Sequence, residues 1–438
     1  MRDLLVTAVL LGAVPFVLFA PYIGILFWSL IGYLNLHRFV WGFAGTIPFA
    51  EIIGVSTLIG LFLSKEEKRF PLTTLTVVWI TFIAWISFTT LFALYPDLAY
   101  TKWLFMAKVM LMSFVTLLVM ARRERVDLLV WVIVLSLGFY GFKGGLFTIT
   151  HMTGTDVLVY GPPKSFIEDN NAIGLALVMA LPLMNYLRKK ITHRLMKWGM
   201  WCVMGLSLTA VIGTHSRGAA LGLAAVGGAA LLQSRYKTKA LAALVLTALV
   251  GSAFVPQAWV ERIQTVRHYE QDDSAMSRIN SWHTSYNLAS DRLIGGGFDS
   301  MQTETYLRYS PGPAPPRALN AHSIYFEVLV EHGFIGLGLF LLLGAMALRT
   351  STWIRQHTEG RDDLTWAREL AASTRLGLIG YFVSGAFLNL AYFDLYYHVI
   401  GILVLTRVIV ERSLAEEVKT TLGSRTTTDR LASGTIGS

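Results

Sequence analysis

Long apolar runs separated by short polar connections dominate the chain. Runs of about 20 residues have the length that an α-helix needs to cross the hydrocarbon core of a membrane. They lack the alternation of apolar and polar residues that is typical of a membrane β-barrel. The pattern predicts about twelve helices, over residues 4–35, 47–64, 72–93, 102–121, 127–149, 171–187, 195–213, 217–233, 238–256, 325–348, 372–391 and 394–411.

Composition agrees with this pattern and excludes a soluble protein. Hydrophobic residues make up 54% of the 438 residues and charged residues only 15%, with a mean hydropathy of +0.53. We therefore predict an all-α, polytopic integral membrane protein. Cys202 is the only cysteine, so the chain forms no internal disulfide and no cysteine-rich metal site.

The positions of Lys and Arg predict the orientation in the membrane. Basic clusters collect in alternate connections, which we assign to the cytoplasm: residues 65–69, 122–125, 188–197, 235–239 and 349–375. The remaining connections then face the outside of the membrane, and both termini are cytoplasmic. The net charge of +9 follows from this arrangement and favours contact with anionic membrane lipids over nucleic-acid binding.

Three regions are expected along the chain. Residues 1–164 form N-terminal membrane helices, residues 165–414 form a membrane core that includes a long outer loop at 257–321, and residues 415–438 form a disordered cytoplasmic tail rich in Thr, Ser and Gly. The first apolar run, 4–35, is too long for one straight span and contains two prolines. It forms either one kinked span or two short helices.

The candidate chemistry lies where the long loop meets the next helix. His322 occupies this position, and an imidazole accepts protons near neutral pH. Arg217, at a predicted helix start, and Arg278 are expected on the same side and supply positive charge. This combination suits a general base beside an anionic leaving group, such as a lipid diphosphate. Ordinary alternatives are a helix-end histidine and arginines that reach lipid phosphates.

A few charged residues fall inside predicted spans. Lys108, Lys143, Glu327 and Glu331 need partners or water there. They either form structural pairs, line a cavity, or mark a substrate or ion path. The histidines show no metal-ligand spacing, and the outer loops show no acidic metal-binding motif.

Several motifs occur in order between about residues 165 and 345. They are Glu168-Asp169-Asn170-Asn171, Thr214-His215-Ser216-Arg217-Gly218-Ala219, Arg278-x-x-x-Trp282, Gly295-Gly296-Gly297-Phe298, Ala321-His322-Ser323-x-Tyr325 and Glu331-x-Gly333-x-x-Gly336. Together they resemble the superfamily of O-antigen ligases (WaaL) and O-antigen polymerases (Wzy). The first half of the chain is similar to the ligase variant associated with exosortase systems.

The resemblance implies a glycosyltransferase of the GT-C type in a bacterial inner membrane. Its outer connections, including the large loop at 257–321, would then be periplasmic. Such an enzyme moves a glycan from undecaprenyl diphosphate to a lipid A-core hydroxyl at the periplasmic face, with inversion, without a metal and without a cofactor. His322 would be the general base, and Arg217 and Arg278 would bind the donor diphosphate. Residues that could line the same cavity are His215, Lys108, Lys143, Asn170, Tyr325 and Glu327.

Other functions stay open at this point. An O-antigen polymerase would use a second lipid-linked glycan as acceptor, and a protein O-oligosaccharyltransferase would use a protein hydroxyl. A transporter or lipid flippase would instead use the charged residues in the spans as a path. The sequence decides neither the acceptor, nor the sugars, nor the oligomeric state.

Overall fold

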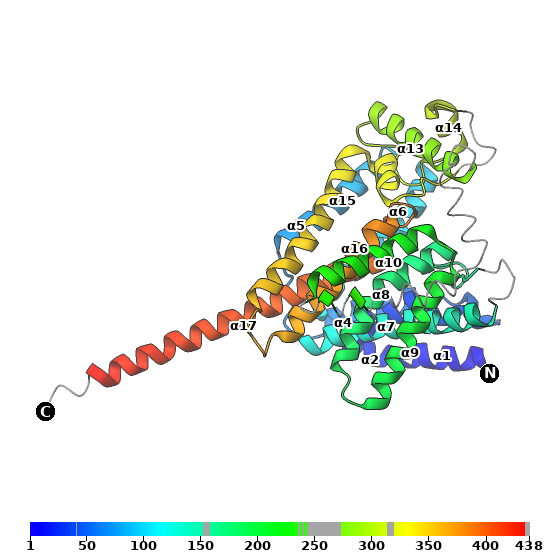
Figure 1. Cartoon of the computed structure of the whole chain (residues 1–438). Helices are drawn as coiled ribbons and strands as arrows, with labels where there is room; N and C mark the ends of the chain where they lie inside the picture. The colour runs from blue at the N-terminus through cyan, green and yellow to red at the C-terminus, as the bar shows by residue number, and fades with distance from the viewer. Residues whose placement is uncertain are drawn as a thin grey trace.

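The computed structural model describes residues 1–40, 42–151, 158–234, 237–238, 241–242, 273–312 and 319–433. Within these ranges every regular element is a helix and no strand occurs, which confirms the all-α prediction. Figure 1 shows the helices gathered into one bundle, with α13 and α14 at one end. The elements are α1 (Arg2–Gly12), α2 (Val14–Phe19), α3 (Pro21–Leu34), η1 (Leu36–Arg38), η2 (Phe43–Thr46), α4 (Phe49–Leu63), α5 (Thr74–Thr90), α6 (Pro96–Val119), α7 (Arg123–Thr150), α8 (Asn170–Lys190), α9 (Arg194–Gly213), α10 (Arg217–Gln233), α13 (Asp273–Asp291), α14 (Thr303–Tyr309), α15 (Ile324–His357), α16 (Thr365–Gly385) and α17 (Asp394–Ser433).

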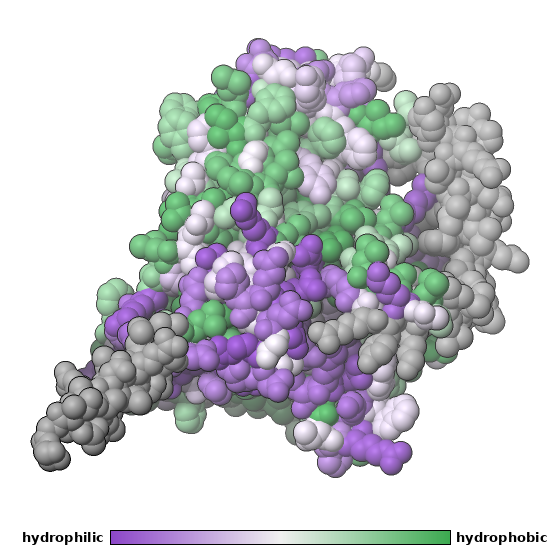
Figure 2. All heavy atoms as spheres, turned by 60° about the vertical axis from the view of Figure 1, so that its left-hand side comes forward, coloured by the Kyte–Doolittle hydropathy of each residue, from purple (hydrophilic) through white to green (hydrophobic). Residues whose placement is uncertain are grey.

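Six helices are long and apolar enough to cross a membrane, counted over the described residues. They are 2–19 (α1 with α2), α6, α7, α8, α9 and α15, and α3, α4, α5 and α10 are shorter apolar helices. Large apolar side chains such as Phe19 and Phe62 are 88% exposed. Figure 2 shows a broad hydrophobic area on one face, with hydrophilic residues above and below it. These features indicate a multi-pass membrane protein, although the described helices do not establish the predicted twelve spans. The predicted helix 238–256 lies almost entirely outside the described residues.

The first apolar run is broken into separate helices. Proline stands in the first turn of both α2 and α3, where its missing N–H costs nothing. Ala20 separates these helices, and its backbone angles of φ −137° and ψ 84° are not helical. α2 lies close against α4, because a Cβ on Gly60 would come within 2.6 Å of the Val17 carbonyl oxygen. The run is therefore divided at Ala20 into the helical segment 2–19 and α3, and it is not one continuous helix.

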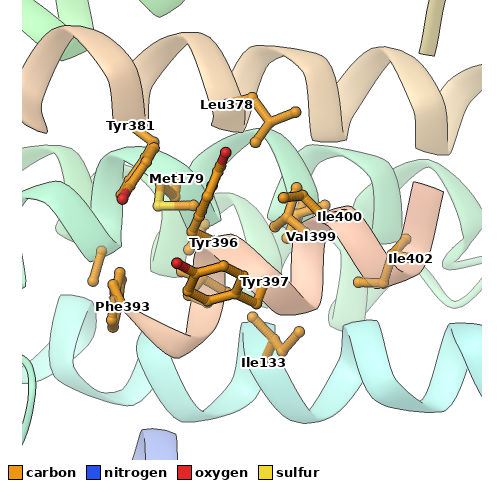
Figure 3. Packing of buried hydrophobic residues seen from close by; sticks show 14 of the residues in the cluster. Ile133, Met179, Leu378, Tyr381, Phe393, Tyr396, Tyr397, Val399, Ile400 and Ile402 are labelled. Atoms are coloured by element: carbon orange, nitrogen blue, oxygen red, sulfur yellow. The ribbon is translucent and has the colours of Figure 1, made fainter. Parts of the chain in front are cut away.

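The start of α17 fills the centre of the bundle. Figure 3 shows Tyr396 and Tyr397 of this helix among side chains from α7, α8 and α16. The Tyr396 ring stacks on Tyr381 of α16 at 4.5 Å between centroids, and the Tyr381 hydroxyl donates to the Leu390 carbonyl at 2.9 Å. The buried hydroxyl is thus hydrogen-bonded, as an apolar core requires. At its other end α17 runs on to Ser433, past residue 415 where the composition predicts disorder.

A kink in α15 joins this helix to the glycine-rich turn at 295–297. Gly333 has φ 69° and ψ −172°, which interrupts the helix. The interruption frees carbonyls of the preceding turn, and Val330 and Glu331 accept hydrogen bonds from the N–H groups of Gly296 and Gly297, each at 2.8 Å. A Cβ on Gly333 would lie 2.0 Å from the Leu293 carbonyl oxygen, so only glycine fits. The kink therefore fixes the turn and the adjoining α13 against α15.

Candidate functional site

The beginnings of α8, α10 and α15 meet at one end of the bundle, which we call the site end. The Asn170 side chain donates to the carbonyl of Thr214 at 2.7 Å and so ties the start of α8 to the turn before α10. A Cβ on Gly174 would approach Ala219 to 2.8 Å, which shows how closely the two helices pack. The Glu168–Asn171 and Thr214–Ala219 motifs are therefore neighbours in space, although about 45 residues separate Asn170 from Thr214.

The last turn of α16 joins α10 and α15 at the same end. A Cβ on Gly218 would come within 3.2 Å of the Ser384 carbonyl oxygen, and a Cβ on Gly385 would come within 2.6 Å of Ile324. Gly218 directly follows Arg217, and Ile324 lies two residues after His322. The structure thus brings both sequence motifs to the same end of α16.

Helix α13 fixes the segment that carries His322. The Trp282 indole N–H donates to the Ala321 carbonyl at 2.9 Å, and its ring stacks on Phe326 at 5.1 Å between centroids. Arg278 lies one helical turn before Trp282, on the same face of α13. The spacing Arg278-x-x-x-Trp282 therefore places an arginine beside the histidine while the tryptophan anchors the loop.

Two charges of opposite sign act on His322. Its pKa is lowered from the usual value, first by partial burial and then by the positive charge of Arg278, whereas Asp169 raises it. The imidazole is consequently neutral at pH 7 and able to accept a proton. Asp169 is the N-cap of α8, and its carboxylate accepts from the backbone N–H groups of Asn171 and Ala172 at 2.8 and 3.0 Å. The sequence motifs contained Asp169, but nothing in them indicated this electrostatic role.

Both histidines of the site motifs have the left-handed backbone conformation. His215 has φ 51° and His322 has φ 48°, a region that costs a non-glycine residue about 1–2 kcal/mol. Each precedes a serine at a helix N-cap. Ser216 accepts from the Ala219 N–H at 3.2 Å, whereas Ser323 makes no capping bond and its buried hydroxyl has no partner among the described residues. Such local strain is common where a side chain must be aimed at a substrate.

The other predicted cavity residues lie in different surroundings. The Tyr325 hydroxyl donates to the Phe382 carbonyl at 2.8 Å, and Glu327 accepts from the Ala391 N–H at 2.9 Å. Lys108 pairs with Glu51 at 3.2 Å, with about half of each side chain exposed. Lys143 lines a separate pocket that also contains Arg38. The described contacts therefore do not join these residues to His322.

The sequence reading overlooked Lys102, the central cation of a buried network. Its ammonium group lies 2.8 Å from Glu331, 3.1 Å from Asp299 and 3.6 Å from Glu327. The Tyr392 hydroxyl donates to the other oxygen of Glu331 at 2.7 Å. This network joins α6 and α15 to the glycine-rich turn, so the glutamate of the Glu331 motif serves packing at the kink.

Two parts of the chain match known families. Residues 202–341 match a family model described as O-antigen ligase. The match supports membership of the O-antigen ligase and polymerase superfamily. Residues 1–192 match a second model, described as a family of unknown function (DUF5935). No curated protein matches the chain.

The ligase-family segment, residues 202–341, contains His215, Arg217, Arg278 and His322. Asp169, Asn170 and Lys102 lie in the part matched by the second family. The site end therefore combines residues from both matched parts. Within the described residues, no group of three or more His, Cys, Asp or Glu side chains has an arrangement that could hold a metal ion.

Proposed function

We propose that this protein is an O-antigen ligase that transfers a glycan from undecaprenyl diphosphate to a sugar hydroxyl of lipid A-core at the periplasmic face of the inner membrane. The family of residues 202–341 supports a lipid-linked glycan donor and a lipid acceptor in general. The observation that carries the proposal is the placement of half-buried His322 next to α13: Trp282, one helical turn after Arg278, donates to the carbonyl of Ala321 at 2.9 Å, and all of these residues lie inside that segment.

The reaction needs a base and a stabilised leaving group. The acceptor hydroxyl attacks the anomeric carbon while the bond from that carbon to the diphosphate oxygen breaks, and His322 takes the hydroxyl proton. Arg217 and Arg278 stabilise the charge of the departing diphosphate. Direct attack inverts the anomeric centre and requires neither a covalent enzyme intermediate nor a metal. Asp169 stabilises the imidazolium that forms.

Replacement of the histidine tests the base assignment. Asparagine tolerates the left-handed backbone at position 322 but accepts no proton at neutral pH, so His322→Asn separates chemistry from folding. We expect transfer to fall by about 10²–10⁴-fold in nanodiscs that contain undecaprenyl diphosphate-linked glycan, lipid A-core and a chelator. Thermal unfolding of the variant should match that of the wild type. Near-normal transfer by His322→Asn would remove the base assignment.

The arginines are tested through the donor. Arg217→Gln and Arg278→Gln should each raise the KM for the donor by about 10-fold or more, because each removes a charge-assisted hydrogen bond to phosphate. The KM for the acceptor should change much less. Unchanged donor dependence in both variants would place the diphosphate elsewhere.

The acceptor and the reaction class are tested in the same system. Transfer to a second lipid-linked glycan, without transfer to lipid A-core, would identify a polymerase, and transfer to peptide hydroxyls would identify a protein O-oligosaccharyltransferase. The transporter alternative needs Lys108, Lys143, Glu327 and Glu331 to form one path. Among the described contacts Lys108 pairs with Glu51, whereas the two glutamates pair with Lys102.

A further inference from the structure

A pocket that contains two cationic side chains lies beside the site end, between η1, α7 and the segment 158–163. Its volume is about 350 Å³, and Arg38 and Lys143 are its only charged lining residues among those described. Its aromatic lining residues are Phe39, Tyr140, Phe147 and Tyr160. A pocket with two cations, no acid and several aromatic walls suits an anionic group attached to a larger amphipathic molecule.

The two cations lack protein partners in the described part of the chain. Arg38 Nε is buried without a hydrogen-bond partner, and neither an ion pair nor a hydrogen bond involves the Lys143 ammonium group. The nearby Glu51 carboxylate is paired with Lys108. Burial and then the Arg38 charge lower the pKa of His37, against the opposing effect of Glu51. A buried guanidinium nitrogen without a partner is costly, and an anionic ligand would satisfy it.

The pocket is rigidly built. The Tyr140 hydroxyl donates to the Leu34 carbonyl at 2.6 Å and ties α7 to the end of α3. Phe39 packs on Tyr140, with ring centroids 6.3 Å apart. A Cβ on Gly144 would lie 2.8 Å from Val159, so the 158–163 wall sits directly on α7 beside Lys143. Both cations are therefore held by fixed elements, which lowers the entropic cost of binding.

The same wall continues into the candidate reaction site. The Val159 N–H donates to the carbonyl of Gly213, the residue before the Thr214–Ala219 motif, at 3.0 Å. The Gly161 N–H donates to the carbonyl of Glu168, the residue before Asp169, at 2.9 Å. The pocket and the site end thus share one backbone segment.

We propose that the pocket of Arg38 and Lys143 binds a phosphate group carried by a lipid at the membrane interface, and that this lipid is the acceptor glycolipid. The second part rests on the proposed function, whereas the first does not. A phosphate held here would orient the acceptor so that its sugar hydroxyl faces His322 across the shared wall.

Binding without turnover tests the pocket independently of catalysis. Titrations use the full-length His322→Asn protein in nanodiscs without donor, with phosphorylated lipid A-core, dephosphorylated lipid A-core or phosphatidylglycerol as the added lipid. We expect the phosphorylated glycolipid to bind at least about 10-fold more tightly than its dephosphorylated form. The double variant Arg38→Gln, Lys143→Gln should lose this preference, and Lys65→Gln, at an exposed lysine outside the pocket, should keep it.

Comparison of the three lipids shows whether the bound phosphate belongs to the acceptor glycolipid or to an ordinary phospholipid. If phosphatidylglycerol binds as tightly and the double variant abolishes that binding, the phosphate site stands and the acceptor assignment is overturned. If the double variant binds all three lipids like the parent protein, the pocket proposal is overturned. With wild-type His322, the double variant should raise the KM for the acceptor about 10-fold and leave kcat unchanged. Absence of transfer together with intact phosphate selectivity would count against the proposed function alone.

Discussion

At the scale of single residues, the site depends on charges whose partners lie far away in the sequence. The pKa of His322 is lowered by the positive charge of Arg278 in α13 and raised by the negative charge of Asp169 at the start of α8. Lys102 is surrounded by carboxylates from α15 and the 295–299 turn. Neighbouring charges of either sign change both the protonation of a group and the stability of the fold. Each effect leads to a separate measurement.

The pH dependence of transfer should respond in opposite directions to the two neighbours of His322. A base works only when deprotonated, so activity falls as the pH drops through the His322 pKa. Arg278→Gln removes a positive neighbour, raises that pKa and moves the acid limb of kcat/KM to higher pH. Asp169→Asn removes a negative neighbour, lowers the pKa and moves the limb to lower pH, while asparagine preserves the N-cap. If the acid limb of kcat/KM lies at the same pH in the wild type and in both variants, His322 is not the base.

Lys102 should matter far more to stability than Lys108, although both lie in α6. Lys102→Met leaves two buried carboxylates without their cation, and we expect a loss on the order of 3 kcal/mol in the free energy of unfolding. Lys108→Met breaks an exposed pair and should cost about 0–1 kcal/mol. Denaturant or thermal unfolding in detergent compares the two. Equal losses would show that the Lys102 network does not hold the fold.

At the scale of elements, the kink of α15 determines how the loop helices sit on the bundle. The break at Gly333 supplies acceptors for the 295–297 turn, and Trp85 of α5 donates to the freed carbonyl of His332 at 2.9 Å. The Glu331-x-Gly333-x-x-Gly336 motif therefore has a structural role: it joins α15 to the 295–297 turn and to α5. It sets the direction from which α13 brings Arg278 toward His322.

Two glycines of α15 allow a matched test of this joint. Gly333→Ala forces a side chain into a backbone with φ 69° and against the Leu293 carbonyl oxygen, which should cost at least about 2 kcal/mol. Gly338→Ala adds a Cβ where nothing lies within 4 Å, and should stabilise the helix by up to about 1 kcal/mol. Thermal unfolding of both purified variants gives the comparison. A Gly333→Ala variant that unfolds at the same temperature as the wild type would contradict the requirement for glycine at the kink.

At the scale of the whole molecule, the candidate site lies at one end of the helical bundle, and the described basic connections at 65–69, 122–125, 188–197 and 349–375 lie at the other. Figure 1 shows α13 and α14 capping one end, while the long α17 leaves the bundle away from that cap. The positive-inside pattern predicts that the capped end faces the periplasm. The proposed reaction takes its lipid-linked donor at the periplasmic face, so orientation is part of the functional proposal.

Chemical labelling in cells tests the orientation. In a Cys202→Ser background, Glu304→Cys in α14 and Glu359→Cys after α15 both place thiols at exposed positions. A membrane-impermeant maleimide added outside spheroplasts should label position 304 and should label position 359 only after lysis. The reverse pattern would overturn the predicted sidedness and, with it, a periplasmic reaction.

The sequence by itself determined the helical class, most helix positions and the motifs of the site. The length of an apolar run and the position of a basic cluster depend only on residues that are adjacent in the sequence, so the sequence alone reveals both. The candidate roles of His322, Arg217 and Arg278 also come from the residue types and spacing of their motifs, and they stay predictions. The structure adds that the motifs of Arg217 and His322 meet at the last turn of α16, and that Trp282 of the Arg278 motif donates to Ala321 beside His322.

Only the tertiary structure decided which charges meet. Lys102 and Lys108 look alike in the sequence, yet one faces buried carboxylates and the other an exposed glutamate. The influence of Asp169 on His322, and the pocket between Arg38 and Lys143, likewise join segments that are distant in the chain. Packing between helices selects such partners, and helical periodicity records only which face a residue occupies, not what that face meets.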